Sequence, residues 1–211
     1  MPNAVRLPEL TSARLRLRPL DGTDIDALFA IFSNPEITRY WSSATMTSPA
    51  DAKALLAEIE DLQARGELME WGLERREDGA LVGTCSLSNI DLDNRRGEIG
   101  FALGRFAWGH GYMREALPVL VEYAFTTLNL HRLEADVDPR NASSLRLLES
   151  LGFKIEGHLR ERWQATGEIQ DSLFLGLLAR EWLGSSIRVA DSARLSDSAS
   201  DVPSANTLPQ G

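Results

Sequence analysis

The stretch that most constrains the fold of this chain is Ala107–Ala116, which reads Ala-Trp-Gly-His-Gly-Tyr-Met-Arg-Glu-Ala. It follows a strand-like segment, Glu98–Leu103, and leads into an amphipathic helix predicted over Glu115–Leu128. Glycines in such a strand–loop–helix unit let a ligand approach the backbone closely, because they carry no Cβ. The first helical turn then offers unpaired N–H donors and the positive end of the helix dipole. The unit therefore predicts a site for a phosphorylated ligand.

Spacing excludes two common phosphate-binding motifs at this loop. A dinucleotide fingerprint would need glycine or alanine three residues after Gly111, where Arg114 stands, and a P-loop would need Gly-Lys-Ser/Thr, which the sequence lacks. An ordinary tight turn is the alternative interpretation of the two glycines. Arg105, His110 and Arg114 surround the loop and place positive groups beside it, although the net charge of the chain is -9.

Composition limits the number of domains, the cellular location and the kind of partner that we expect. The 211 residues are 43% hydrophobic, which is enough for one domain with a proper core. No apolar run approaches the roughly 20 residues that span a bilayer, the N-terminus has no signal core, and Cys85 is a single cysteine. We therefore expect a cytoplasmic protein, monomer or homodimer, without membrane attachment. The acidic balance argues against nucleic-acid binding and suits a cationic partner such as an amine.

Hydrophobic periodicity predicts an α/β (α+β) fold. Strands are expected at 14–20 (as an edge strand), 69–75, 81–88, 97–104, 132–137, 153–161 and 169–178. Helices are expected at 21–33, 48–65, 115–128 and 141–151, with an aromatic loop at 37–47 and a polar link at 90–96. Consecutive strands favour antiparallel pairing, whereas the unit Glu98–Val137 favours a parallel crossover. The result is a mixed, mostly antiparallel seven-stranded sheet with helices on both faces.

The domain is expected over residues 1–184. From Ser185 the composition shifts to Ser, Ala, Asp and Pro, which predicts a disordered tail over 185–211.

The segment Leu130–Phe153 is highly patterned, and here the chain resembles the GCN5-related N-acetyltransferase (GNAT) superfamily. Within it the chain looks most like the RimJ/RimL-type branch, which acetylates the N-termini of ribosomal proteins. Arg14–Leu20, Asn34–Thr38 and Glu98–Phe101 fit that branch too, and the resemblance covers about Leu10–Leu183. It implies a GNAT fold, with acetyl-CoA as the phosphorylated ligand and no metal.

The family's loop pattern, Gln/Arg-x-x-Gly-x-Gly/Ala, falls on Trp108, Gly111 and Met113. The central glycine matches and both outer positions depart, which leaves binding to backbone N–H groups of the loop. Asn141 matches a family asparagine that contacts the cofactor, and it is equally suited to cap a helix. The resemblance thus implies cofactor contacts from Phe101, Ala102, Leu103, Trp108, Gly109, His110, Gly111, Tyr112, Met113, Arg114 and Asn141.

Acetyl transfer needs a neutral amine, and a carboxylate can remove its proton directly or through water. Glu98 is the candidate base, because similar enzymes often place a catalytic glutamate on this strand. The alternative is a surface charge paired with Arg95 or Arg96. Glu70, which opens an earlier strand, is a weaker candidate.

The leaving thiolate needs a proton or a hydrogen-bond donor. Many superfamily members use a tyrosine seven residues after the asparagine, where this chain has Leu148. Ser144 matches a serine of the RimL-like pattern and could hydrogen-bond the thiolate; its alternative role is in the first helical turn. Backbone N–H groups of Phe101–Leu103 are expected to face the thioester oxygen.

Tyr40 and Trp41 are candidates for lining the acceptor pocket, or else for anchoring the loop in the core. His110 and His131 lack metal-ligand spacing, and Cys85 is expected to be a buried apolar residue. We expect an N-acetyltransferase acting on a protein N-terminal α-amine, with the N-terminus of a ribosomal protein as the candidate acceptor. The alternatives are a small-molecule amine acetyltransferase and a non-catalytic acyl-CoA-binding sensor.

Overall fold

A computed structural model describes residues 7–41, 44–165 and 167–184. The predicted tail over 185–211 lies outside these residues. The strands are β1 (Leu10–Thr11), β2 (Leu15–Pro19), β3 (Leu68–Arg75), β4 (Leu81–Asp91), β5 (Arg96–Leu103), β6 (Arg132–Val137), β7 (Lys154–Ala165) and β8 (Glu168–Leu178). The helices are the 3-10 turns η1 (Gly22–Asp24) and η2 (Arg105–Ala107), and α1 (Ile25–Phe32), α2 (Pro35–Thr38), α3 (Pro49–Arg65), α4 (Tyr112–Thr126) and α5 (Ala142–Ser150).

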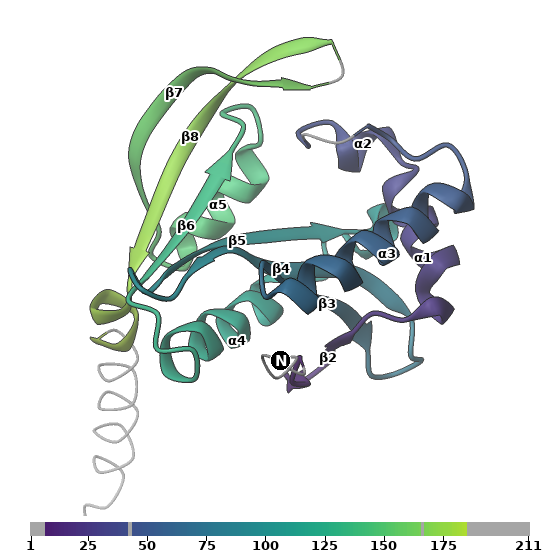
Figure 1. Ribbon diagram of the computed structural model, residues 1–211, viewed down its shortest axis with the longest axis horizontal. Helices are drawn as coiled ribbons and strands as arrows, with labels where there is room; N and C mark the ends of the chain where they lie inside the picture. Colours follow the sequence, from purple (N-terminus) through teal and green to yellow (C-terminus); the bar gives the residue numbers. More distant parts are fainter. Residues whose placement is uncertain (1–6, 42–43, 166, 185–211) are drawn as a thin grey trace, which may run out of the picture.

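The strands form one mixed sheet in the order β1-β2-β3-β4-β5-β6-β8-β7 (Figure 1). All neighbours are antiparallel except β5 and β6, which are parallel and joined through α4. The predicted mixed, mostly antiparallel sheet is thus confirmed, but it has eight strands rather than seven. The additional strand, β1, pairs Leu10 and Thr11 with Leu17 and Arg16, so β2 is not the edge strand that its alternation suggested.

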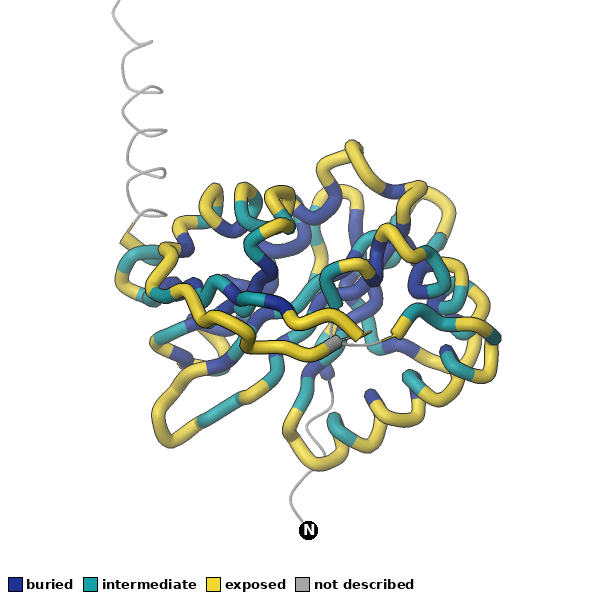
Figure 2. Tube along the Cα trace, turned by 90° about the horizontal axis from the view of Figure 1, so that it is seen from above, coloured by how far each residue is buried: buried dark blue, intermediate teal, exposed yellow. Residues whose placement is uncertain are grey.

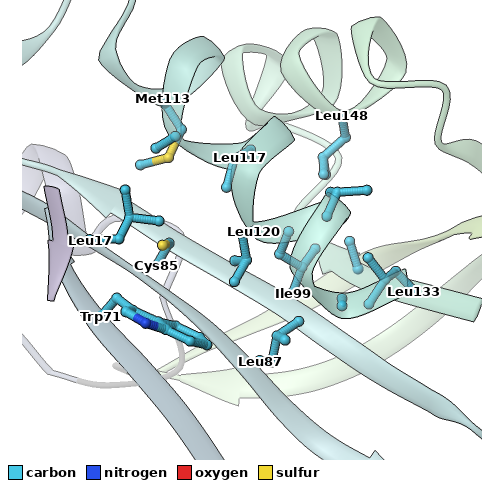
Figure 3. Close-up of a cluster of buried hydrophobic side chains, with 14 of the residues drawn as sticks. Leu17, Trp71, Cys85, Leu87, Ile99, Met113, Leu117, Leu120, Leu133 and Leu148 are labelled. Carbon is cyan, nitrogen blue, oxygen red and sulfur yellow. The ribbon is translucent and has the colours of Figure 1, made fainter. Parts of the chain in front are cut away.

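The larger core lies between α4 and one face of the sheet (Figure 3). Met113, Leu117 and Leu120 project from α4 at spacings of four and three, so they share one side of the helix. They face buried side chains of the strands, among them Leu17, Trp71, Cys85, Leu87, Ile99 and Leu133. Burial raises the pKa of the Cys85 thiol well above its ordinary value, with a smaller contribution from Glu70, so Cys85 behaves as an apolar residue.

A second core covers the opposite face, under α1 and α3. Its buried members are Leu20, Leu28, Ile31, Phe32, Ile37, Ala52, Leu56, Ile59, Leu81 and Ala102. Helices therefore cover both faces of the sheet, as predicted (Figure 1). Figure 2 shows the resulting distribution, with buried positions inside and exposed positions on outer helical turns and loops.

Several predicted boundaries were wrong for local reasons. The helix predicted at 21–33 begins as the 3-10 turn η1, because Asp21 caps that turn through the N–H of Thr23. The loop predicted at 37–47 begins later than expected, since Asn34 accepts a hydrogen bond from the N–H of Glu36 at 2.9 Å and starts α2 with proline at its first position.

Strand β4, before the predicted polar link, extends three residues beyond its predicted end at residue 88, whereas β5, after the link, is shifted by one residue from the predicted range 97–104. The link at 90–96 is a tight hairpin in which Asp91 pairs with Arg96. The side chain of Asp91 stabilises it by accepting a hydrogen bond from the N–H of Asn94 at 2.9 Å. The last hairpin also extends beyond the predicted ranges, with β7 running from Lys154 to Ala165. No helix of the described chain is long and apolar enough to cross a membrane.

Candidate active site

The central feature of the site is the separation of β5 from β6. These strands pair only over Arg96–Glu98 and Arg132–Glu134, and the last pair is Glu98 with Glu134. Beyond Glu98, β5 continues to Leu103 with β4 as its ladder partner. The edge of β5 that faces β6 therefore offers backbone N–H and C=O groups from about residue 99 onward.

The loop after β5 has the shape expected of an anion-binding turn. Gly109 and Gly111 adopt φ values of +79° and +76°, in the left-handed region where other residues are strained. Gly111 is the N-cap of α4, so the helix begins at Tyr112 rather than at the predicted Glu115. The free N–H groups of the first turn, 112–114, thus follow the glycine directly.

A cavity of about 560 Å³ lies between residues 101–103 of β5, this loop and the start of α5. Successive side chains of a strand point to opposite faces. Phe101 and Leu103 pack with the core under α4, whereas Ala102 belongs to the core under α1 and α3. Because all three line the cavity, it reaches both faces of the sheet at the place where β5 and β6 separate.

Almost every cofactor residue predicted from the resemblance lines this cavity. The exception is His110, whose ring stacks on that of Tyr112 with centroids 5.6 Å apart and an angle of 8°. The full lining is Glu36, Ile37, Tyr40, Trp41, Phe101, Ala102, Leu103, Trp108, Gly109, Gly111, Tyr112, Met113, Arg114, Asn141, Ser143, Ser144, Arg146 and Leu147.

Sequence reasoning missed five of these residues: Glu36, Ile37, Ser143, Arg146 and Leu147. The last three are spaced at three and four along α5, so they share a helix face. That periodicity, placed beside Asn141, is the signal that could have identified them.

Positive charge accompanies the cavity. Arg114 and Arg146 are exposed and contribute to its walls. Arg105 pairs with Glu36 across 2.9 Å and lies over the Trp108 ring, 4.8 Å from its centroid. Together with the N-terminus of α4, these groups favour an anionic ligand in an otherwise acidic protein.

The start of α5 serves as both a cap and a cavity wall. The Asn141 side chain accepts hydrogen bonds from the N–H of Ser144 at 3.2 Å and from the hydroxyl of Ser143 at 3.0 Å. Both interpretations of Asn141 are thus compatible with the geometry. Leu148 is completely buried and faces the core rather than the cavity (Figure 3).

Glu98 lies outside the cavity lining, three residues before Phe101 on β5. Its carboxylate accepts a hydrogen bond from the side-chain amide of Asn89 at 2.9 Å. The predicted alternative partner, Arg96, forms ion pairs with Asp91 at 3.5 Å and with Glu134 at 3.2 Å.

Glu70 lies on the same face of the sheet, two strands away. It pairs across the ladder with Ser86, which pairs in turn with Gly100. Burial raises the pKa of Glu70 from 4.5 to about 7, while hydrogen bonds with the hydroxyls of Thr84 and Ser86 lower it in part. Glu70 is therefore a partly buried carboxyl that can change its charge near neutral pH.

The aromatic residues Tyr40 and Trp41 follow α2. Both line the cavity. The Trp41 ring also packs on Phe32, with centroids 5.0 Å apart. The guanidinium groups of Arg39 and Arg140 lie 5.4 and 5.8 Å from the centroid of the Tyr40 ring.

Comparison of this chain with known proteins identifies the family to which it belongs. A family model described as an acetyltransferase (GNAT) domain matches residues 14–154. The chain belongs to the GNAT family. An uncharacterized N-acetyltransferase, p20 of Bacillus licheniformis, is 39% identical over 175 residues, which are 83% of this chain and 98% of that protein. The GNAT fold and an acetyl-CoA-dependent acetyltransferase activity follow.

Two further relatives have named acceptors. The ribosomal protein uS5-alanine N-acetyltransferase of Escherichia coli is 26% identical, covering 82% of this chain and 92% of that protein. The spermidine N-acetyltransferase of Vibrio cholerae, solved with CoA and spermine, is 26% identical with a TM-score of 0.72, covering 81% and 99% of the two chains. The family membership therefore establishes acetyl transfer to nitrogen but leaves the acceptor open.

Proposed function

We propose that this GNAT protein transfers an acetyl group from acetyl-CoA directly to a protein N-terminal α-amine within a ternary complex. The observation that carries the proposal is the cavity that joins the glycine loop on one face of the sheet to Tyr40 and Trp41 on the other. Such a passage lets a donor and an acceptor approach the same strand edge from opposite sides. No covalent enzyme intermediate is then needed, which agrees with the burial of Cys85.

On the donor side, the phosphates of acetyl-CoA would lie against the N–H groups at 109–114, with Arg114 and Arg146 supplying positive charge. The pantetheine arm would extend along the free edge of β5. Backbone N–H groups of Phe101–Leu103 on that edge are then the donors for the thioester oxygen, where negative charge develops during attack.

The reaction forms a C–N bond and breaks the C–S bond of the thioester. The attacking amine loses one proton and the departing thiolate gains one. An α-amino group has a pKa of about 7.7–8.0, so a base near neutral pH assists. We assign this role to Glu98, acting through water because its carboxylate lies outside the cavity lining; Glu70 is the competing carboxyl. Ser144, on the cavity wall, would donate a hydrogen bond to the thiolate.

The preference for a protein N-terminus rests on the RimJ/RimL-like motifs and on the uS5-alanine relative. A polyamine or another small amine is the second candidate, because a spermidine acetyltransferase is equally similar in sequence. A sensor that binds acyl-CoA without turnover is the third.

The test is release of CoA thiol from acetyl-CoA with a panel of N-terminal peptides and small amines, using the wild type, Glu98→Gln and Glu70→Gln. Release with peptides that falls at least about 10²-fold in Glu98→Gln, and much less in Glu70→Gln, is expected. Release of CoA thiol only with small amines would reject the protein N-terminus as the acceptor and support the second candidate, a small amine. CoA binding without release in the whole panel would favour the sensor, and the reverse order of the two variants would make Glu70 the base.

A further inference from the structure

Arg14, immediately before β2, reaches across to the glycine loop although about a hundred residues separate them in sequence. Its Nε donates to Glu115 at 2.6 Å and its Nη1 donates to the carbonyl of His110 at 3.1 Å. Its guanidinium carbon lies 4.8 Å from the centroid of the Tyr112 ring. The backbone N–H of Arg14 and the hydroxyl of Ser12 also donate to Glu115. One arginine thus contacts the loop, the first helical turn and an aromatic ring together.

The contact with His110 fixes the direction of a neighbouring N–H group. In a planar trans peptide the C=O of one residue and the N–H of the next point in opposite directions, and the described chain contains no cis peptide bond. Because Arg14 holds the carbonyl of His110, the N–H of Gly111 points away from Arg14. Gly111 belongs to the cavity lining.

This peptide lies where the chain has most freedom, between the left-handed Gly109 and Gly111. Two other side-chain hydrogen bonds, made by Trp108 and His110, stay within the segment 103–110. Trp108 Nε1 donates to the carbonyl of Leu103 at 3.0 Å, and His110 Nδ1 pairs with the carbonyl of Trp108 at 2.9 Å. Arg14 instead connects the loop to the sheet, so it can limit rotation of the 110–111 peptide.

The pair with Glu115 has an electrostatic effect as well. Partial burial raises the pKa of Glu115, but hydrogen bonds from Arg14 and Ser12 outweigh it and bring the pKa below its ordinary value. Glu115 is therefore an anion in the first turn of α4, close to where phosphates would bind. Arg14 compensates this charge at 2.6 Å.

We propose that Arg14 is a positioning residue for the pyrophosphate of acetyl-CoA: it turns the Gly111 N–H toward the cavity and neutralises Glu115. The inference rests on the proposed binding of acetyl-CoA at the glycine loop. Lysine is a poor replacement for arginine in this role, because its compact ammonium group lacks the planar fork of donors that reaches a carboxylate and a carbonyl at once beside an aromatic ring.

The test compares the wild type, Arg14→Gln, Arg14→Lys and the control Arg16→Gln. Arg16 lies two residues further along the chain, in β2, and pairs with Glu74 and Glu9 rather than with the loop. The dissociation constant of CoA is measured by titration calorimetry, and KM for acetyl-CoA and kcat are measured with the best acceptor. Thermal melting curves verify that each variant is folded.

Arg14→Gln is expected to raise the CoA dissociation constant and the KM for acetyl-CoA about tenfold, the effect of losing charge-assisted hydrogen bonds, with kcat within about twofold. Arg14→Lys should recover little, and Arg16→Gln should bind CoA like the wild type. Unchanged affinity in Arg14→Gln, equal losses in Arg14→Gln and Arg16→Gln, or full recovery by lysine would each overturn the inference. A wild type that binds no CoA would instead reject the proposed donor site.

Discussion

The partly buried carboxyl of Glu70 makes the stability of this protein depend on pH in a defined direction. Burial opposes the charged form and raises the pKa of Glu70 from 4.5 to about 7. In the unfolded chain the group is solvated and titrates near 4.5. Below pH 4.5 both states are protonated and the carboxyl costs nothing. As pH rises from 4.5 to 7, the unfolded state ionises first, so the folded state loses stability relative to it.

The magnitude follows from the same two values. At about 1.36 kcal/mol for each pH unit, a pKa raised from 4.5 to about 7 corresponds to about 3 kcal/mol of lost folding free energy above pH 7. Glu70→Gln removes this cost and keeps an amide of nearly the same shape beside the hydroxyls of Thr84 and Ser86. Any penalty of the amide itself does not change with pH.

Urea unfolding at pH 5 and at pH 8.5 measures the difference in unfolding free energy between Glu70→Gln and the wild type. This difference should move in favour of the variant by about 2–3 kcal/mol between the two pH values. Glu67→Gln, which removes an exposed carboxylate from the same stretch of chain, is the control. A difference that is the same at both pH values, or that moves against the variant at pH 8.5, would refute the desolvation of Glu70.

Two further substitutions test the site. Gly111→Ala places a side chain at φ +76°, a strain of about 1–2 kcal/mol, and should raise the KM for acetyl-CoA about tenfold in steady-state kinetics. The control Gly79→Ala, at φ +74° in the β3–β4 turn, should leave that KM unchanged. An equal rise in KM in both variants would contradict the role of Gly111. Leu148→Tyr restores the common family tyrosine, but its position is completely buried, so urea unfolding should show a loss of about 1–3 kcal/mol and kcat should not rise. A gain in kcat would show that position 148 reaches the thiolate.

The parts of the fold that sequence could predict are those set by local patterns. The strand–loop–helix unit around Gly109 and Gly111, the helix α3 and the parallel crossover through α4 all follow from periodicity and breaker residues. The two-residue strand β1 could not be predicted, because only its pairing with Leu17 and Arg16 makes it a strand. The early start of α4 depends on the left-handed conformation of Gly111, which has no signature distinct from an ordinary turn.

In the candidate site too, features set by local sequence patterns could be predicted and features set by tertiary packing could not. Resemblance placed the loop and Asn141 beside one cavity, because these segments adjoin secondary structure with strong patterns. It could not show that Glu98 lies outside the cavity lining or that Glu70 is partly desolvated, since strand periodicity gives the face of a residue but not its depth. Nor could it indicate Arg14, whose partners become neighbours only when the sheet forms.

The two cores on opposite faces of the sheet have an evolutionary consequence. Apart from Leu81 and Ala102, the buried residues under α1 and α3 all come from the contiguous segment 20–59, which also carries Tyr40 and Trp41. The glycine loop, Asn141 and the core under α4 are encoded almost entirely elsewhere in the chain. Under the proposed function, in which Tyr40 and Trp41 face the amine, substitutions confined to that one early segment would reshape the acceptor wall and leave the residues that bind the donor unchanged. A scaffold of this kind would be able to change its acceptor without rebuilding its donor site.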